Sequence, residues 1–310
     1  MAKYSVAKKV LINADPQTVY DRVADYGTWT TWSPWLCAEP DAEVTVSDDP
    51  RSVGSRYAWS GDVVGAGELE HEVLEPGKSI RDEIRFLRPM KSVSKVGFDF
   101  VAKDGGTEVT WSMSGSLPFF LFWMTGSIET FVGMDYTRGL KMLKEWIETG
   151  DIKSKTSIVG PQAMGPFSVL GTRAQCEMKN TGPSMEQSFA KTFELLQRAG
   201  METCGEKITV YHDFDLKKQT FDYTSGVLFA EAPASVPEGL NSWSLPSVQA
   251  FRVDHVGAYE HLGNAWSAAN QHVRSKKMKQ SKVGTFELYK NDPSETAPED
   301  LLTEIYLPLK

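Results

Sequence analysis

The second half of the chain repeats itself, and this repeat limits the folds that the half can adopt. KITVYHDFD aligns with TFELYKNDP so that Tyr211 falls on Tyr289, an offset of 289 − 211 = 78 residues. The same offset aligns MEQSFAKTFELLQRAG with GNAWSAANQHVRSKKM and GVLFAEA with EIYLPL, and it brings FSVLGTRAQCEM near PSVQAFRVDHVG. These four matches predict two strand–helix–strand–strand units in one pseudo-twofold antiparallel sheet. We expect both helices on one face of this sheet and a groove on the other.

Strand alternation assigns side chains to the two faces. In TFELYK, Phe286 and Leu288 share one face, and Glu287 and Tyr289 share the other. We expect the apolar pair to meet the helices, which leaves the carboxylate in the groove. The residues expected to line the groove are this carboxylate, the tyrosines and nearby indoles: Glu287, Tyr289, Tyr211, Trp243 and Trp266. A buried carboxylate either pairs with a bound organic cation or has a raised pKa suited to proton transfer. The competing interpretation is a carboxylate that bridges strands within the sheet.

The first half has a different order of elements: a strand, a helical segment, several strands and one long helix. Residues 4–10 alternate with period two, and Asp15 followed by Pro16 is typical of a helix start. A long amphipathic helix is predicted over roughly 128–148. The fold class is therefore α+β, with a helix-grip in which a curved antiparallel sheet holds the long helix around an apolar cavity. Six residues are candidates to line this cavity, with plain core packing as the favoured alternative for each: Tyr57, Trp59, Phe98, Phe100, Trp111 and Met113.

Two other features of the first half are interpreted as structural. LPFFLFWM, residues 117–124, is too short to span a bilayer. We favour a cavity lid or core packing over a membrane-touching patch, because no basic amphipathic helix accompanies the segment. His71 lies in the charged stretch 68–72 and is interpreted as part of a solvated strand face.

Composition restricts the function classes. We predict domains at 1–150 and 166–310 joined by a linker at 151–165, where Gly, Pro, Ser and Lys accumulate, with a short entry strand as the alternative. A net charge of -8 argues against direct contact with nucleic acid, and no membrane partner is expected, because no apolar run is long enough to span a bilayer. Three widely spaced cysteines and no signal-peptide pattern predict a cytoplasmic protein without disulfides.

We expect no metal and no cofactor, because neither metal-ligand spacing nor a phosphate loop is present. A protein partner or a homo-oligomer is compatible with the sequence.

The first half resembles the SRPBCC superfamily, which is START-like and polyketide cyclase-like. The resemblance rests on ADPQTVYDRVADYGTWTTWSPW, GGTEVTWSMSG and MDYTRGLKMLKEWIE, and it covers essentially the whole half. It implies a cavity for lipids, hydrophobic hormones or polyketides, and only some relatives are enzymes.

The second half is similar to the GyrI-like small-molecule-binding domain, which includes the effector-binding domains of bacterial multidrug-responsive regulators. The matching runs are FSVLGTR, YHDFDLKKQTFDYTSGV, FRVDHVGAYEHLGNAWSA, TFELYKNDP and TEIYLPLK. In that family the carboxylate of this strand sits in an aromatic cavity and contacts lipophilic cations, which carries over to Glu287. The resemblance also implies that Tyr259 and Trp266 lie near the pocket.

Three functions follow as hypotheses. The first is a small-molecule binding or sensing protein with two cavities. The second is a hydrolase, because some GyrI-like proteins resemble hydrolases of cyclopropane-containing electrophiles in which a Glu and a Tyr act together. Glu287 and Tyr289 are then the catalytic candidates. The third is an interaction protein that presents one domain to a partner. Whether the protein is an enzyme stays open at this point, and binding is ranked first.

Overall fold

The chain folds as two units, Met1–Lys153 and Ser154–Lys310. The computed structural model describes residues 1–201, 205–215 and 218–310. Of the two alternatives for 151–165, the structure has the entry strand over most of the range, because Lys155–Met164 form the edge strand β8, which pairs with β13 (Val248–Val256). Gly160 and Pro161 lie beside a shift in this pairing register. Gly and Pro are tolerated at sheet edges and bulges, which explains why this strand resembles a linker in sequence.

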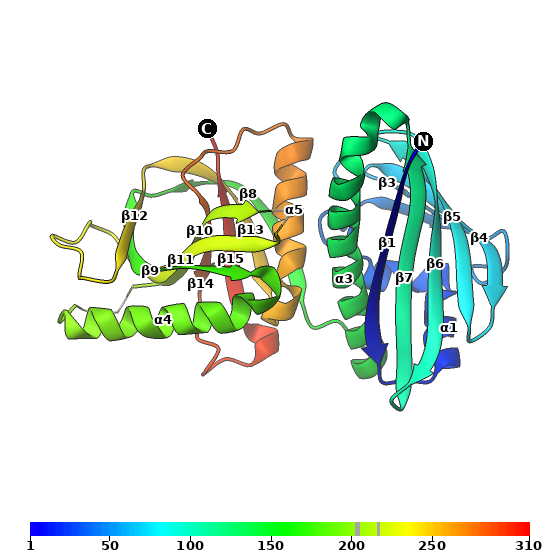
Figure 1. Cartoon of the computed structure of the whole chain (residues 1–310), viewed down its shortest axis with the longest axis horizontal. Helices are drawn as coiled ribbons and strands as arrows, with labels where there is room; N and C mark the ends of the chain where they lie inside the picture. Colours follow the sequence, from blue (N-terminus) through cyan, green and yellow to red (C-terminus); the bar gives the residue numbers. More distant parts are fainter. Residues whose placement is uncertain (202–204, 216–217) are drawn as a thin grey trace. The chain divides into compact units, whose positions relative to one another are not determined.

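The first unit is a seven-stranded antiparallel sheet that holds a long helix (Figure 1). The strand order is β1-β7-β6-β5-β4-β3-β2. The strands are β1 (Ala2–Ile12), β2 (Glu43–Val46), β3 (Arg56–Ser60), β4 (Ala66–Glu75), β5 (Ser79–Arg88), β6 (Ser92–Lys103) and β7 (Gly106–Leu117). The helices are α1 (Pro16–Val23), η1 (Tyr26–Thr28), α2 (Trp29–Trp32), η2 (Phe119–Met124) and α3 (Thr125–Thr149). The predicted helix-grip is confirmed.

Local chemistry accounts for the ends of these helices. The Asp15 carboxylate accepts hydrogen bonds from the backbone of Gln17 and Thr18, and Pro16 occupies the first helical position of α1. Helix α3 ends at Gly150, whose φ of 87° lies in the left-handed region that glycine adopts without strain. Gly139 lets α3 approach the sheet closely, because a Cβ there would lie 2.7 Å from the Trp111 ring.

The segment LPFFLFWM does not pack in the core. Four of the aromatic side chains in η2 are exposed: Phe119, Phe120, Phe122 and Trp123. Only Leu121 and Met124 of η2 pack against the core of the unit. The expectation of core packing is therefore wrong for the aromatic residues. Among the described residues, no helix is long and apolar enough to cross a bilayer.

The second unit is an eight-stranded antiparallel sheet built from the predicted repeat, and its order is β12-β9-β11-β10-β14-β15-β13-β8. The elements of the first repeat are β9 (Phe167–Glu177), η3 (Met178–Asn180), α4 (Thr181–Arg198), β10 (Lys207–Asp215) and β11 (Thr220–Phe229). After β12 (Asn241–Leu245), the second repeat comprises β13, η4 (Tyr259–His261), α5 (Leu262–Ser275), β14 (Thr285–Tyr289), η5 (Pro298–Asp300) and β15 (Leu302–Pro308). The repeats meet where β10 pairs with β14, and the predicted pseudo-twofold sheet is confirmed.

The helices cover the face opposite to the one expected. Trp266 of α5 and Phe189 of α4 contact the side chains of Glu287 and Tyr289, so the helices and the carboxylate share one face. Phe286 and Leu288 instead belong to a core on the other face, together with Phe167. Alternation correctly predicts which residues share a face, but both faces of this sheet are buried. The pattern therefore does not show which face the helices cover.

Candidate functional site

Glu287 lies at the centre of the second sheet, on the pseudo-twofold axis. On β14 it pairs with Thr209 of β10 on one side and with Ile305 of β15 on the other. Its side chain is buried, and the residue is 1% exposed. The repeat itself therefore places this carboxylate at the junction of the two repeats.

Three neutral donors surround the carboxylate. The Tyr289 hydroxyl donates to Oε2 at 2.5 Å, and the Trp266 indole Nε1 donates to Oε1. The Tyr211 hydroxyl is a third hydrogen-bond partner of the carboxylate. Tyr211 and Tyr289 occupy equivalent positions in the two repeats, so the pseudo-symmetry directs two phenols at one acid.

Burial and hydrogen bonding act on this acid in opposite directions. Burial raises the pKa of Glu287, while the hydrogen bonds from Tyr289, Trp266 and Tyr211 lower it. Burial also raises the pKa of Tyr211 and Tyr289 well above the usual tyrosine range, with the Glu287 charge as the next cause. Both phenols therefore keep their protons. In the described part of the chain, no ion pair involves Glu287.

Aromatic rings surround this acid. The Tyr211 and Trp266 rings meet edge-to-face at 5.2 Å, and the Tyr289 ring meets Tyr259 at 5.9 Å and Phe189 at 5.7 Å. Tyr259 is 40% exposed, whereas Glu287 beneath it is buried. The site thus combines a buried acid with an aromatic wall that reaches solvent at Tyr259.

One residue predicted for this site, Trp243, lies away from Glu287. Trp243, expected in the groove, lies on the opposite face, where its ring packs against Phe286 and its indole donates to the Val283 carbonyl at 2.8 Å. Two residues of α4 that contact Tyr289 were not predicted from the sequence. The Phe189 ring packs against the Tyr289 ring, and the Met185 sulfur lies 3.9 Å from the Tyr289 hydroxyl. Both lie on α4, the helix that the repeat pairs with α5, which carries Trp266.

Further hydroxyl groups extend the hydrogen-bond network behind Tyr289. Thr209 Oγ1 lies 3.2 Å from the Tyr289 hydroxyl and 3.0 Å from Ser225 Oγ. Thr192 of α4 donates to the Ser225 carbonyl at 2.9 Å. This network holds the phenol of Tyr289 in position against the carboxylate.

The first unit contains a cavity of about 230 Å³ between the sheet and α3. Of the predicted residues, Tyr57, Trp59, Trp111 and Met113 line it. Phe98 and Phe100 do not, because Phe98 packs against Trp29 and Trp32, and Phe100 packs against Tyr20. These last two residues confirm the plain-core alternative. Most of the lining residues were not predicted from the sequence, among them Trp29, Trp32, Trp35, Phe86, Val132, Asp135 and Tyr136.

Polar groups in this cavity are few. The Asp135 carboxylate accepts from the Trp35 indole at 3.1 Å and from Arg138 at 2.5 Å. The buried Trp32 indole N–H has no hydrogen-bond partner among the described residues. The Tyr136 ring stacks on Trp111 at 3.9 Å. The cavity is therefore an aromatic box whose wall holds one carboxylate and the unsatisfied Trp32 indole N–H.

His71 is buried rather than solvated, so its interpretation as a surface residue is wrong. Nδ1 lies 2.6 Å from the Asp82 carboxylate, and Nε2 lies 3.0 Å from the Ala24 carbonyl, which acts only as an acceptor. The Tyr26 ring stacks on the imidazole at 3.8 Å. Because Asp82 is buried, its pKa is raised, and the His71 hydrogen bond opposes this shift. Neither His71 nor Asp82 lines the cavity.

Metal-ligating side chains do not cluster in the described part of the chain. In the described ranges, no group of three or more His, Cys, Asp or Glu is placed to hold a metal ion. Cys37 and Cys176 are free thiols, and Cys204 lies outside the described residues.

Comparisons with solved structures find similarities at low identity. A protein from Chromobacterium violaceum, CV1439, is 17% identical over 47% of this chain and 98% of its own, with a TM-score of 0.37. The Aha1 dimer from Colwellia psychrerythraea is 16% identical over 47% and 97%, with a TM-score of 0.35. EcmrR from a complex with DNA is 16% identical over 58% and 66%, with a TM-score of 0.41.

The domain assignment rests on two family matches. No curated protein matches the chain. Residues 3–148 match the family described as polyketide cyclase / dehydrase and lipid transport. Residues 163–310 match the GyrI-like small molecule binding domain. The chain therefore joins a polyketide cyclase-like SRPBCC domain at 3–148 to a GyrI-like small-molecule binding domain at 163–310.

Proposed function

We propose that the GyrI-like domain binds lipophilic cations through Glu287, and that the SRPBCC domain binds a separate apolar ligand. The observation that carries the first part is a carboxylate that is 1% exposed and surrounded by neutral donors and aromatic rings. An ionised acid in such a place lacks a counter-charge, and an organic cation supplies one. The faces of Tyr211, Trp266 and Tyr259 add cation–π attraction.

The test uses two probes of nearly equal shape and opposite charge, tetraphenylphosphonium and tetraphenylborate. Wild-type protein is expected to bind the cation more tightly in calorimetry. Glu287→Gln is expected to weaken cation binding by about tenfold or more without weakening binding of the anion. Glu304→Gln is a matched control, because Glu304 is a buried carboxylate on the opposite face of the sheet, paired with Arg252. Equal loss in both variants, or none in Glu287→Gln, would refute the assignment.

A hydrolase is the second candidate, and the contact between Tyr289 and Glu287 favours it. A carboxylate with a raised pKa can accept a proton from water, and a phenol held against it can donate one to a leaving carbon. Incubation with cyclopropane-containing electrophiles, followed by mass spectrometry, measures turnover. If the domain is a hydrolase, Tyr289→Phe is expected to abolish turnover, and the affinity of this variant for tetraphenylphosphonium is expected to stay unchanged. Absence of any product with the wild-type protein leaves the binding function as the conclusion.

The ligand of the SRPBCC domain is proposed to be an aromatic or fused-ring molecule with a hydrogen-bond donor. Flat rings fit between the indoles and phenols of the cavity wall, and the Asp135 carboxylate can accept from such a donor. Val132→Phe fills the cavity from α3, so it is expected to lower the affinity for the fluorescent probe N-phenyl-1-naphthylamine. Val101→Phe, on an exposed position of β6, is the control. Unchanged binding in the cavity variant would mean that the probe binds elsewhere.

A further inference from the structure

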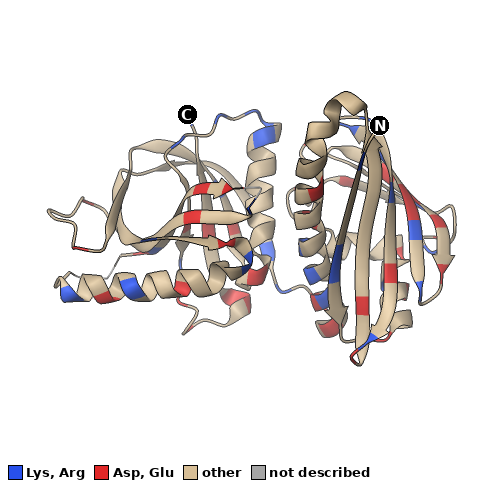
Figure 2. Cartoon of the chain, in the orientation of Figure 1, with Lys and Arg blue, Asp and Glu red and all other residues tan. Residues whose placement is uncertain are grey.

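The exposed aromatic side chains of η2 have no role in either ligand site. Phe119, Phe120, Phe122 and Trp123, the aromatic tip, are each 60–75% exposed. They lie in a stretch of 20 residues, Val109–Ile128, that contains no charged side chain. Figure 2 shows this part of the chain, the end of β7 and the turn into α3, without Lys, Arg, Asp or Glu. Contiguous exposed apolar surface of this kind marks an interaction site.

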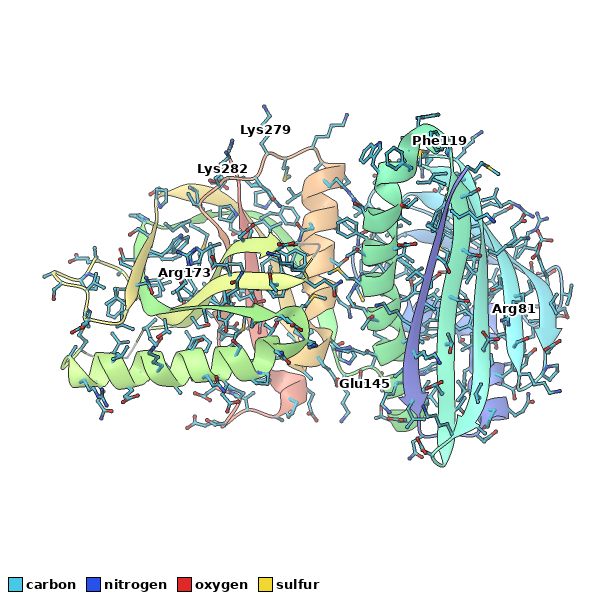
Figure 3. All side chains as sticks on the ribbon, in the orientation of Figure 1. Arg81, Phe119, Glu145, Arg173, Lys279 and Lys282 are labelled. Carbon is cyan, nitrogen blue, oxygen red and sulfur yellow. The ribbon has the colours of Figure 1, made fainter. Side chains whose placement is uncertain are left out.

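Other exposed apolar residues lie at the same end of the domain. Pairing of Ala2 with Leu117, of Ser94 with Gly115 and of Phe86 with Ser92 brings together the start of β1, the end of β7 and the β5–β6 turn. Phe119 is seen at this end in Figure 3. The exposed apolar side chains contributed there by the neighbouring segments are Met1, Leu87, Met90 and Val93. The aromatic tip is thus part of a larger apolar surface.

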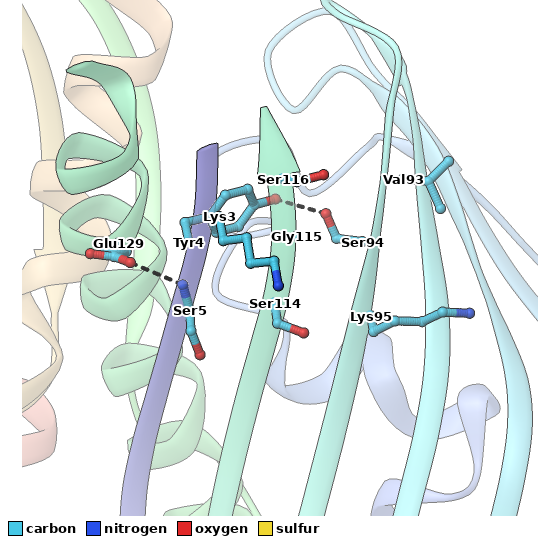
Figure 4. A pocket seen from close by; sticks show the side chains of 10 residues that line it. All are labelled: Lys3, Tyr4, Ser5, Val93, Ser94, Lys95, Ser114, Gly115, Ser116 and Glu129. Atoms are coloured by element: carbon cyan, nitrogen blue, oxygen red, sulfur yellow. Dashed lines mark hydrogen bonds between the residues drawn. The ribbon is translucent and has the colours of Figure 1, made fainter. Parts of the chain in front are cut away.

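The charges at this end are mainly positive, although the chain as a whole has a net charge of -8. Lys3, Arg88 and Lys91 form no ion pair within the described ranges, and no acid occurs between Glu83 and Asp99. Glu129 is nearby, but it accepts a hydrogen bond from the Ser5 backbone at 2.9 Å (Figure 4). Figure 4 also shows Lys3 beside the hollow that Ser116 and Val93 border. The other acids at this end, Glu39, Asp41, Glu43 and Asp62, lie in and beside the β3–β4 turn, towards the far edge of the sheet, and the Glu39 carboxylate accepts hydrogen bonds from the backbone of this turn.

We propose that this end of the SRPBCC domain docks onto the surface of a bilayer that contains anionic lipids. Phe and Trp side chains partition into the bilayer interface, and nearby Lys and Arg are attracted to anionic headgroups. Stable binding at a membrane surface requires two such signals, and this end supplies both. The acids at the other end of this domain, such as Asp104 and Glu108, are repelled by the same surface, so they favour docking by this end. An acidic protein partner would use the cations, but it would leave the aromatic rings in water.

The aromatic tip lies close to the cavity of the SRPBCC domain, so docking would bring the cavity near the bilayer. Leu121 and Met124 of η2 pack on the same core as Val132 of α3, and Val132 lines the cavity. Phe86, at the end of β5, lines the cavity from the other side. An apolar ligand that leaves a docked bilayer can therefore enter along η2 and the β5–β6 turn. Docking itself does not depend on the proposed ligands of either domain.

The test is sedimentation of the full chain with phosphatidylcholine vesicles, with and without phosphatidylglycerol. Wild-type protein is expected to bind the mixed vesicles. Replacing Phe119, Phe120 and Trp123 together by Ser, or combining Lys3→Glu with Lys91→Glu, is expected to lower the partition coefficient by about tenfold or more. The matched controls, Val101→Ser and Lys78→Glu, change an exposed apolar residue and an exposed cation at the opposite end of the sheet and are expected to bind normally.

Trp123 provides a readout of insertion. Lipids with brominated acyl chains are expected to quench part of the wild-type fluorescence, and Trp123→Phe, which keeps an aromatic ring, is expected to remove that quenching while it preserves sedimentation. Circular dichroism of every variant verifies folding. Failure of wild-type protein to bind the mixed vesicles overturns the proposal, as does binding that the tip substitutions leave unchanged. A concentration-dependent dimer that the tip substitutions abolish would show that a second copy covers the surface, and it would also overturn the proposal.

Discussion

At the scale of the residue, Glu287 shows how a fold can retain an acid that burial disfavours. Removal from water raises its pKa, and three donors recover only part of the lost hydration. Those donors come from β10, β14 and α5, so the carboxylate is held by elements of both repeats. A group that destabilises the folded state in its ionised form is retained when binding or catalysis requires it.

This balance predicts how stability depends on pH. In the folded protein the raised pKa lets Glu287 hold a proton that the unfolded chain has already released. Stability therefore falls as pH rises from the ordinary glutamate pKa through the raised value. Glu287→Gln cannot ionise, so its unfolding midpoint is expected to exceed that of wild type at mildly alkaline pH, with a difference that shrinks on acidification. Thermal scans across pH measure this.

The control variant for that experiment, Glu304→Gln, is expected to change the unfolding midpoint in the opposite direction. Glu304→Gln also removes a buried carboxylate, but it leaves Arg252 without the partner that lies 2.6 Å from it. Its midpoint is expected to fall at neutral pH. A lower midpoint in both variants would mean that the hydrogen bonds of Glu287 outweigh the cost of its burial.

At the scale of the element, the His71–Asp82 pair connects three segments of the first unit. His71 is on β4, Asp82 is on β5, and the Ala24 carbonyl follows the end of α1. Both side chains of the pair are 0% exposed. Loss of one partner leaves the other buried and unpaired, which typically costs 3–5 kcal/mol.

His71→Ala is accordingly expected to lower the free energy of unfolding by about 3–5 kcal/mol. Denaturant titration, followed by the fluorescence of the nearby Trp29, measures the change. Lys103→Ala removes an ion pair with Glu108 on the exposed surface and is expected to have a much smaller effect. Similar losses in the two variants would show that the buried pair has no special importance.

The elements themselves were largely predictable, whereas their exposure was not. Period-two and helical patterns predict the helix-grip, and the 78-residue offset predicts the second sheet, because both can be found from the spacing of residue types along the sequence alone. Leu69 and His71 share a face of β4, so alternation could have predicted burial of His71. The face that the helices cover, and the exposure of η2, depend on packing between elements. Trp243 and the aromatic tip were therefore misplaced for the same physical reason.

At the scale of the whole molecule, two separate cores predict two unfolding transitions. The division falls between Lys153 and Ser154, and each unit has its own sheet. Trp111→Ala removes a buried indole from the first core, so it is expected to cost about 3–5 kcal/mol there and to shift only one transition in calorimetry. Tetraphenylphosphonium is expected to raise only the other transition. A single transition that responds to both changes would contradict independent unfolding.

The measurement that tests the central claim most directly is the affinity for tetraphenylphosphonium as a function of pH. If Glu287 is the counter-charge, the affinity of wild type is constant at high pH and decreases as pH falls through the raised pKa of the carboxyl. The decrease is expected to begin above the ordinary glutamate range, and Glu287→Gln is expected to bind weakly with no such dependence. A wild-type affinity that stays constant across this range, or a dependence that survives in Glu287→Gln, would contradict the account.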